Sequence, residues 1–250
     1  ASAVLFVSGE DDALIEGFTI TGGTGSVRGL EYVGGGIYVS ASAPTISNCI
    51  VRNNNADTGG GLYAVVFDGL VKGCTFESNS TNATGQGGGG LYFTICNSTV
   101  EHTTVSGNSG SHGGGIRTDG GSLILTNSVI RDNDATFGGG ILVSSGIADV
   151  ANATIVGNDA DLSFASNGGG MKNSPNSEVT VTNSIVWDNA PSEIYDSWGV
   201  DTVVSYSAVR GGWDGEGIGV LDVDPQLDAS LRPDASSPVV DAGDNDVVGE

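Results

Sequence analysis

The chain has 250 residues, of which 42 are glycine and 38% are hydrophobic, and its 30 acidic and 8 basic residues give a formal net charge of −22. This charge repels nucleic-acid phosphates and anionic membrane surfaces, so the composition argues against a nucleic-acid-binding protein. No apolar run approaches the roughly 20 residues that a membrane-spanning helix needs, so we expect no membrane insertion by this segment. The hydrophobic content suffices for a narrow, continuous core.

The beginning of the chain predicts a strand that is already under way. Residues 1–7 (ASAVLFV) are mostly apolar, and no capping element precedes them. We therefore expect the chain to be part of a longer protein. Residues 17–23 then match the repeat signature described next, with glycine in place of its final asparagine, and predict a partial first coil.

Two coupled signatures return six times along the chain. The first is a glycine triplet followed by a bulky apolar residue, and the second is a β-branched or aromatic residue three places before an asparagine. The triplets begin at Gly34, Gly59, Gly88, Gly113, Gly138 and Gly168. The asparagines are Asn54, Asn79, Asn108, Asn133, Asn158 and Asn189. A period of 25 to 31 residues predicts a solenoid.

Within each coil, inward and outward positions alternate, which predicts short β-strands joined by bends. One inward apolar row is Ile46, Val71, Val100, Leu125, Val150 and Val181, and another is Val51, Phe76, Val105, Ile130, Ile155 and Val186. A third row predicts bends with a left-handed backbone: Asn48, Gly73, His102, Asn127, Asn152 and Asn183. We interpret both asparagine rows as scaffold, not as ligand sites.

The last partial coil covers residues 206–212, after which the periodicity fades. Long helical patterns are absent. The sequence thus predicts an all-β fold, a parallel β-helix of about eight coils over residues 1–212. Residues 213–250 are expected to form an irregular C-terminal tail that packs on the last coil and protects its open edge.

Three cysteines do not form a disulfide framework. Cys49 and Cys74 occupy the same repeat position one coil apart, so their backbones should lie about 4.8 Å from each other. This separation leaves two alternatives, a bridge or two stacked core thiols, and stacked thiols are favoured.

The coupled motifs over residues 17–212 resemble those of right-handed parallel β-helices of the pectin-lyase-like class. They are also similar to the repeats of chlamydial polymorphic membrane proteins, whose passenger regions are adhesins. Residues 224–243 (DPQLDASLRPDASSPVVDAG) resemble the C-terminal part of secreted bacterial repeat proteins of the choice-of-anchor Q type. The resemblance implies a bacterial, secreted or cell-surface protein, while the fold itself carries lyases, hydrolases, epimerases and adhesins.

The residue after each triplet's apolar position is expected to face outward beside a corner of variable length. This row is Tyr38, Tyr63, Tyr92, Arg117, Leu142 and Lys172. Three tyrosines on consecutive coils predict a flat strip on which sugar rings stack, with cations beyond it for carboxylated sugars. Tyr38, Tyr63, Tyr92 and Arg117 are therefore the candidate ligand-binding residues. The alternative is that the tyrosines only stabilise neighbouring coils.

Catalytic candidates are few. A lyase or epimerase needs a cation to neutralise a uronate carboxylate and a base nearby, for which Arg117, His112, Tyr92 and Lys172 are the candidates. A hydrolase needs two opposed carboxylates, and Asp119 has no clustered aspartate on the adjacent coils. The sequence contains no convincing catalytic set.

No cofactor is expected unless it is calcium. Its candidate ligands are Asp222, Asp224 and Asp228, or Asp241, Asp244 and Asp246, or the corner pairs Asp132 with Asp134 and Asp159 with Asp161. None of these clusters matches the EF-hand loop or the nonapeptide calcium repeat.

The leading hypothesis is a non-catalytic extracellular module, structural or adhesive, that binds a surface glycan or protein. The first alternative is a polysaccharide-active enzyme, a lyase or epimerase before a hydrolase, with its groove beside the row of Tyr38, Tyr63, Tyr92 and Arg117. The second alternative is a subunit that forms filaments through exposed coil edges.

Overall fold

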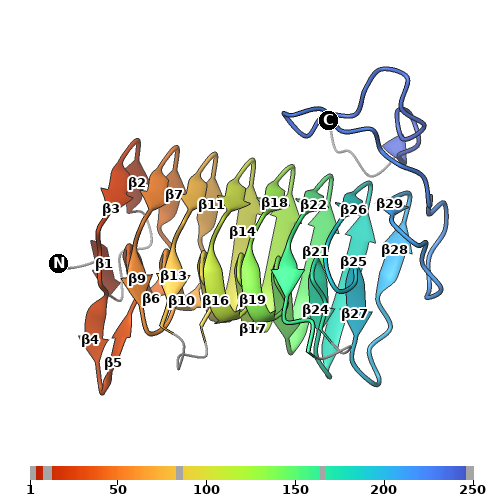
Figure 1. Cartoon of the computed structure of the whole chain (residues 1–250). Helices are drawn as coiled ribbons and strands as arrows, with labels where there is room; N and C mark the ends of the chain where they lie inside the picture. Colours follow the sequence, from red (N-terminus) through yellow and green to blue (C-terminus); the bar gives the residue numbers. More distant parts are fainter. Residues whose placement is uncertain (1–3, 8–12, 83–86, 164–166, 246–250) are drawn as a thin grey trace.

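The computed structural model describes residues 4–7, 13–82, 87–163 and 167–245, and in these residues the chain winds into a parallel β-helix without any α-helix. The coils stack along one axis, with the N-terminal coil at one end and the C-terminal tail at the other (Figure 1). Two faces carry eight parallel strands each, about seven turns from first to last. The predicted fold class is confirmed.

Three faces alternate around each coil. The strands that follow the glycine triplets are β1 (Val4–Val7), β6 (Ile37–Ser42), β10 (Leu62–Phe67), β14 (Leu91–Glu101), β17 (Ile116–Thr126), β20 (Ile141–Ser144), β24 (Met171–Asn173) and β27 (Ile194–Asp196). The same sheet has a second row of strands, to which the C-terminal halves of β14 and β17 also belong. The other strands of this row are β2 (Leu14–Glu16), β7 (Thr45–Ser47), β11 (Leu70–Lys72), β21 (Gly146–Ala151), β25 (Ser177–Thr182) and β28 (Val203–Ser205).

The second sheet carries the signature that ends in asparagine. Its strands are β3 (Thr19–Thr21), β8 (Ile50–Arg52), β12 (Thr75–Glu77), β15 (Thr104–Ser106), β18 (Val129–Arg131), β22 (Thr154–Val156), β26 (Ile185–Trp187) and β29 (Ala208–Val209). The third sheet is short: β9 (Asn55–Ala56), β13 (Ser80–Thr81), β16 (Ser109–His112), β19 (Asp134–Phe137) and β23 (Asp159–Ala160). The antiparallel hairpin of β4 (Ser26–Arg28) and β5 (Glu31–Val33) projects from the first coil.

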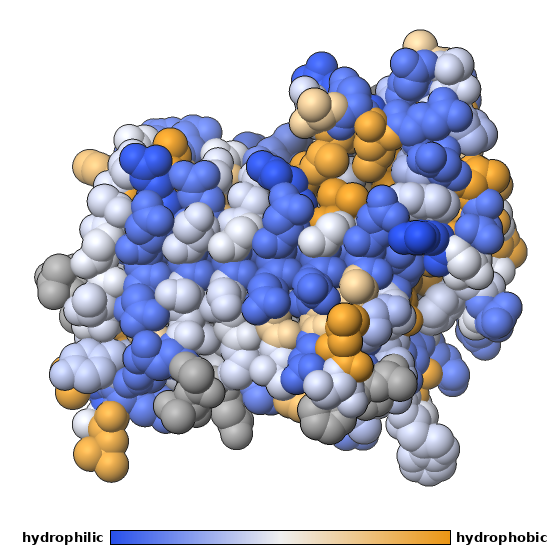
Figure 2. Space-filling view, in the orientation of Figure 1, coloured by the Kyte–Doolittle hydropathy of each residue, from blue (hydrophilic) through white to orange (hydrophobic). Residues whose placement is uncertain are grey.

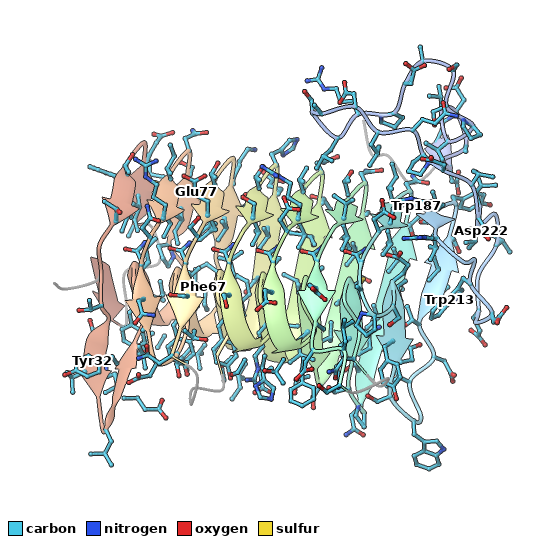
Figure 3. All side chains as sticks on the ribbon, viewed as in Figure 1. Tyr32, Phe67, Glu77, Trp187, Trp213 and Asp222 are labelled. Atoms are coloured by element: carbon cyan, nitrogen blue, oxygen red, sulfur yellow. The ribbon has the colours of Figure 1, made fainter. Side chains whose placement is uncertain are left out.

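The core is a continuous column of apolar side chains inside the coils. Both predicted inward rows are buried, and Phe67, Phe76 and Phe93 are among the largest fully buried side chains. Figure 3 shows Phe67 within the coils and Trp213 at the C-terminal end, where it packs against the core. The glycine triplets are needed because the coils approach closely there: a Cβ on Gly114 would overlap the backbone carbonyl oxygen of Asp134.

The predicted bends are confirmed, because all six residues of the row from Asn48 to Asn183 have φ between 50° and 61°. The other asparagine row is buried and forms a hydrogen-bond ladder along the axis. The backbone N–H and side-chain Nδ2 of each asparagine donate to the Oδ1 of the asparagine on the next coil, at 2.9–3.2 Å.

The asparagine ladder has a defined beginning and end. The backbone N–H of Gly23 donates to Asn54 Oδ1, and Asn189 donates to the carboxylate of Glu193. Each Nδ2 also donates to a backbone carbonyl, as Asn108 does to Phe76 at 2.9 Å. The bonds from one asparagine to the next all run toward the C-terminal end, and the carboxyl group of Glu193 accepts the last of them.

Residues beyond β29 lie along the last coil. The backbone N–H groups of Val204, Tyr206 and Val209 donate to the carbonyls of Glu216, Ile218 and Leu221, at 2.8–2.9 Å. Farther on, the side chain of Asn183 bonds both the N–H and the C=O of Asp244. In Figure 2 the face in view is mostly hydrophilic, and apolar residues gather where the tail meets the last coils.

The three cysteines are all free and buried, which resolves the alternative left open for Cys49 and Cys74. Cys74 Sγ accepts a hydrogen bond from the backbone N–H of Cys49, and burial raises the pKa of the Cys74 thiol to about 11. These thiols therefore serve as small core side chains in the stacked row.

Candidate functional site

The candidate site is built on one outward row of the triplet-following strands. Strand register aligns Tyr38, Tyr63, Tyr92, Arg117, Leu142 and Lys172 in one line, as the repeat predicts. The register also adds Tyr195, which pairs with Lys172 on the last coil. Sequence analysis missed Tyr195 because no glycine triplet precedes it.

The tyrosines stack on one another along the axis of the rod. Ring centroids are 5.8 Å apart between Tyr38 and Tyr63 and 5.1 Å apart between Tyr63 and Tyr92. A cation covers each end of this column, Arg28 from the hairpin at 4.9 Å from the Tyr38 ring and Arg117 at 4.7 Å from the Tyr92 ring. The column is a series of cross-strand aromatic and cation–π contacts, each of which stabilises neighbouring coils.

This arrangement corrects the prediction of a flat, open strip. Tyr38 is 6% exposed and Tyr92 is 7% exposed, while Tyr63 is partly buried. Burial raises the pKa of both Tyr63 and Tyr92. The side chains do point away from the core, but ring faces that contact each other do not offer the stacking surface that a sugar needs.

Arg117 lies at the junction between the tyrosine column and a group of cations. Its side chain is buried and its Nη2 donates to Asp119 Oδ2 at 3.0 Å. The hydroxyl of Tyr92 donates to the same carboxylate oxygen at 3.2 Å. Asp119 is thereby engaged in positioning Arg117 and Tyr92.

Beyond Arg117, the structure brings His112 and Lys172 to the same pocket. The pocket has a volume of about 320 Å³ and is lined by His112, Arg117, Phe137, Leu142, Ser144, Lys172 and Ser174. We call it the cationic pocket. Lys172 Nζ lies 4.5 Å from the centre of the Phe137 ring, and the His112 ring lies 5.1 Å from it. Sequence analysis missed Phe137. Its position directly before the triplet that begins at Gly138 could have placed it beside the outward row.

In the cationic pocket, the pKa values of His112 and Lys172 are both lowered, which favours the neutral form of each side chain. Burial lowers the pKa of His112, and the positive charges of Arg117 and Lys172 lower it further. Burial also lowers the pKa of Lys172. At neutral pH the pocket therefore presents charged Arg117 and Lys172 beside a neutral imidazole.

The predicted calcium ligands lie in two regions, the tail and the corners beside the third sheet. Asp222, Asp224 and Asp228 each accept backbone hydrogen bonds in turns of the tail. Asp246 lies outside the described residues, and Asp241 and Asp244 are the described members of its cluster. Among the residues that the structure describes, no group of three or more histidine, cysteine, aspartate or glutamate side chains could hold a metal ion.

Two corner aspartates do come together in the third sheet. Asp134 and Asp159 are register partners and line a cavity of about 460 Å³ that also includes Asp161. Burial raises the pKa of Asp134, and the two neighbouring carboxylates raise it further. This cluster contains the predicted neighbours Asp159 and Asp161, whereas Asp132 is paired with Arg131 at 2.7 Å.

Comparison with known proteins places the fold in a family. The family model of the right-handed β-helix region matches residues 35–209, and the chain belongs to this family. Searches of the curated proteins and of the solved structures returned no significant match. In the described part of the chain, no helix has the length and apolarity needed to cross a membrane.

Proposed function

We propose that the chain is a non-catalytic, extracellular β-helix module that binds an acidic glycan in the cationic pocket. The observation that carries the proposal is the convergence of His112, Arg117 and Lys172 beside Phe137, in a chain whose net charge is −22. A sugar carboxylate or sulfate pairs with guanidinium and ammonium groups, and the aromatic ring supplies an apolar wall.

An extracellular, adhesive role is supported by the resemblance of the coupled glycine and asparagine motifs to chlamydial polymorphic membrane protein repeats. The tail's resemblance to secreted proteins of the choice-of-anchor Q type supports the same setting. The rigid coils suit a surface module, because the asparagine ladder and the continuous core hold the outward row in place.

Calorimetric titration with three polysaccharides tests the proposal: a polyuronate, a sulfated glycan and a neutral glucan. We expect the acidic glycans to bind and the neutral one not to bind, with affinity falling as salt is added. Lys172→Ala should weaken binding about tenfold or more. Lys72→Ala is the matched control, because Lys72 is the chain's other lysine, lies in β11 outside the cationic pocket and pairs with Glu101.

Equal binding of neutral and acidic glycans, or equal loss in the two lysine variants, contradicts the proposal. The pH dependence adds a second criterion. Because the pKa of His112 is lowered, the imidazole gains its charge only below the ordinary histidine range. Binding of an acidic glycan should therefore tighten as pH falls below the ordinary histidine pKa, and His112→Gln should remove this dependence.

A lyase is the second candidate function, and the state of His112 favours it. A neutral imidazole beside two cations has the components for removing a proton next to a neutralised uronate carboxylate. Incubation with polyuronate, with and without calcium, tests this candidate by the ultraviolet absorbance of unsaturated products. If the absorbance grows with the wild type and not with His112→Gln, the chain is a lyase and the proposal of a non-catalytic binding module is wrong.

Self-association through coil edges is constrained by the tail. Residues 216–221 occupy the backbone groups at the C-terminal edge, so a head-to-tail filament would require this segment to move. Sedimentation at increasing protein concentration tests this alternative, and a growing mass would support it.

A further inference from the structure

The last coil presents a tryptophan to solvent. Trp198 is 96% exposed and lies in a turn in which the N–H of Val200 donates to the carbonyl of Ser197 at 3.1 Å. Gly199 completes the turn with φ of 80°. An indole that is left wholly in water contributes no burial energy, whereas the same ring on a ligand removes a large apolar surface from water.

The turn that carries Trp198 is braced by a buried polar network. Asp196 accepts hydrogen bonds from Thr202 N–H at 3.0 Å, from Thr202 Oγ1 at 2.7 Å and from Asn173 Nδ2 at 2.9 Å. Asn173 and Thr202 are fully buried, and the N–H of Ser197 donates to the carbonyl of Asn173. Because both ends of the turn are held, the backbone position of Trp198 is set before any ligand arrives.

Trp198 lies one coil beyond the cationic pocket. The pocket reaches Ser174, and strand register pairs Asn173 with Asp196, which places Ser197 next to Ser174 on the following coil. Neighbouring strands are about 4.8 Å apart. Lys172 Nζ is 5.7 Å from the centre of the Tyr195 ring, so the coil that carries Tyr195 and Trp198 already lies beside a residue of the pocket.

We propose that Trp198 forms a second, aromatic subsite that stacks on a sugar ring of the glycan held in the cationic pocket. This inference rests on the proposed function and deepens it, because it specifies an oligosaccharide that lies along the rod over at least two coils. The tyrosine column does not serve this role, since its ring faces contact one another, whereas Trp198 is open. A membrane surface is disfavoured as the occupant by the net charge of −22.

Titration with two probes, galacturonic acid as the monomer and an oligogalacturonate, tests the subsite. Trp198→Ala should lower affinity for the oligomer about tenfold and leave affinity for the monomer unchanged, because the monomer fills the cationic pocket alone. Trp198→Tyr should retain most of the oligomer affinity. Leu30→Ala is the control, because Leu30 is fully exposed at the hairpin of the first coil.

The outcomes separate the two proposals. Unchanged oligomer affinity in Trp198→Ala, with the loss in Lys172→Ala still present, overturns the aromatic subsite and leaves the pocket. Absence of binding of either probe to the wild-type chain overturns both. Equal loss for monomer and oligomer also contradicts the subsite, because it indicates a disturbed pocket. The thermal transition of each variant shows whether the fold is intact.

Discussion

Two rows run along the whole rod with the same period, the buried asparagine ladder inside and the tyrosine-to-lysine row outside. The ladder holds the same residue on six consecutive coils, from Asn54 to Asn189. The outer row begins with three tyrosines and then changes to Arg117, Leu142 and Lys172. One row is uniform and the other varies, although both are set by the same coil geometry.

The difference follows from what each position must satisfy. A buried asparagine has donors and an acceptor that an identical neighbour matches, and there is no water to replace a missing partner. The outer side chains can be partnered by a neighbouring ring, a loop or solvent, so their identity is free to change. The coils where the outer row departs from tyrosine are the coils that form the cationic pocket.

The largest expected effect comes from breaking the ladder at its centre with Asn108→Ala. This change removes the acceptor for Asn79 N–H and Nδ2 and the donor to Phe76, all buried. We expect a loss of about 3–5 kcal/mol in the free energy of unfolding, measured by urea denaturation. The control is Asn97→Ala, an exposed asparagine that bonds Asp68. Similar losses in both variants would contradict the distinction between the rows.

A smaller loss is expected when the outer row is broken at Tyr63. Tyr63→Ala removes two ring contacts, to Tyr38 and to Tyr92, and opens part of the column. We expect about 2 kcal/mol of destabilisation by thermal unfolding. Glycan affinity should change little, because the cationic pocket lies beyond Arg117. If binding disappears while the fold persists, the tyrosines form part of the ligand site.

The end of the ladder predicts a pH-dependent effect. Burial raises the pKa of Glu193 from 4.5 to about 7, although the hydrogen bonds from Asn189 and, to a smaller extent, the charge of Arg210 oppose the shift. The neutral acid is thus favoured in the folded chain, so its stabilising contribution is present below about pH 4.5 and is lost as pH rises through about 7.

Glu193→Gln stays neutral and keeps an acceptor for Asn189, so the variant should gain about 1–2 kcal/mol relative to the wild type between about pH 5 and about pH 8. Thermal unfolding across this range measures the gain. A difference between variant and wild type that is constant with pH would show that the carboxyl group does not titrate in this way.

The smallest expected effect concerns an outer bend. Ile95 has φ of 54° and is 65% exposed, a conformation that β-branched residues disfavour. Ile95→Asn should therefore stabilise the chain by about 0.5–1 kcal/mol, as measured by thermal unfolding. Destabilisation would indicate that the isoleucine makes a contact that compensates for its backbone.

The repeat was the strongest guide to both fold and site. Spacing alone placed His102 and Asn152 in left-handed bends and aligned Tyr38, Tyr63 and Tyr92. It did not predict that the rings would cover one another, since periodicity defines which residues are neighbours and not how their side chains turn. Phe137 and Tyr195 were missed for a related reason, because each lies outside the repeated signature.

The amino-acid sequence by itself determined the coil, because glycine where backbones nearly touch, asparagine where amides must pair and apolar residues at alternate positions allow few other arrangements. Only the tertiary structure decided the cationic pocket and the position of Trp198. His112 and Arg117 lie on either side of one glycine triplet, whereas Lys172 lies two coils farther along the chain, and the lengths of the intervening corners set whether it meets them. The convergence of side chains from different coils depends on the summed register of the strands, which no local pattern contains.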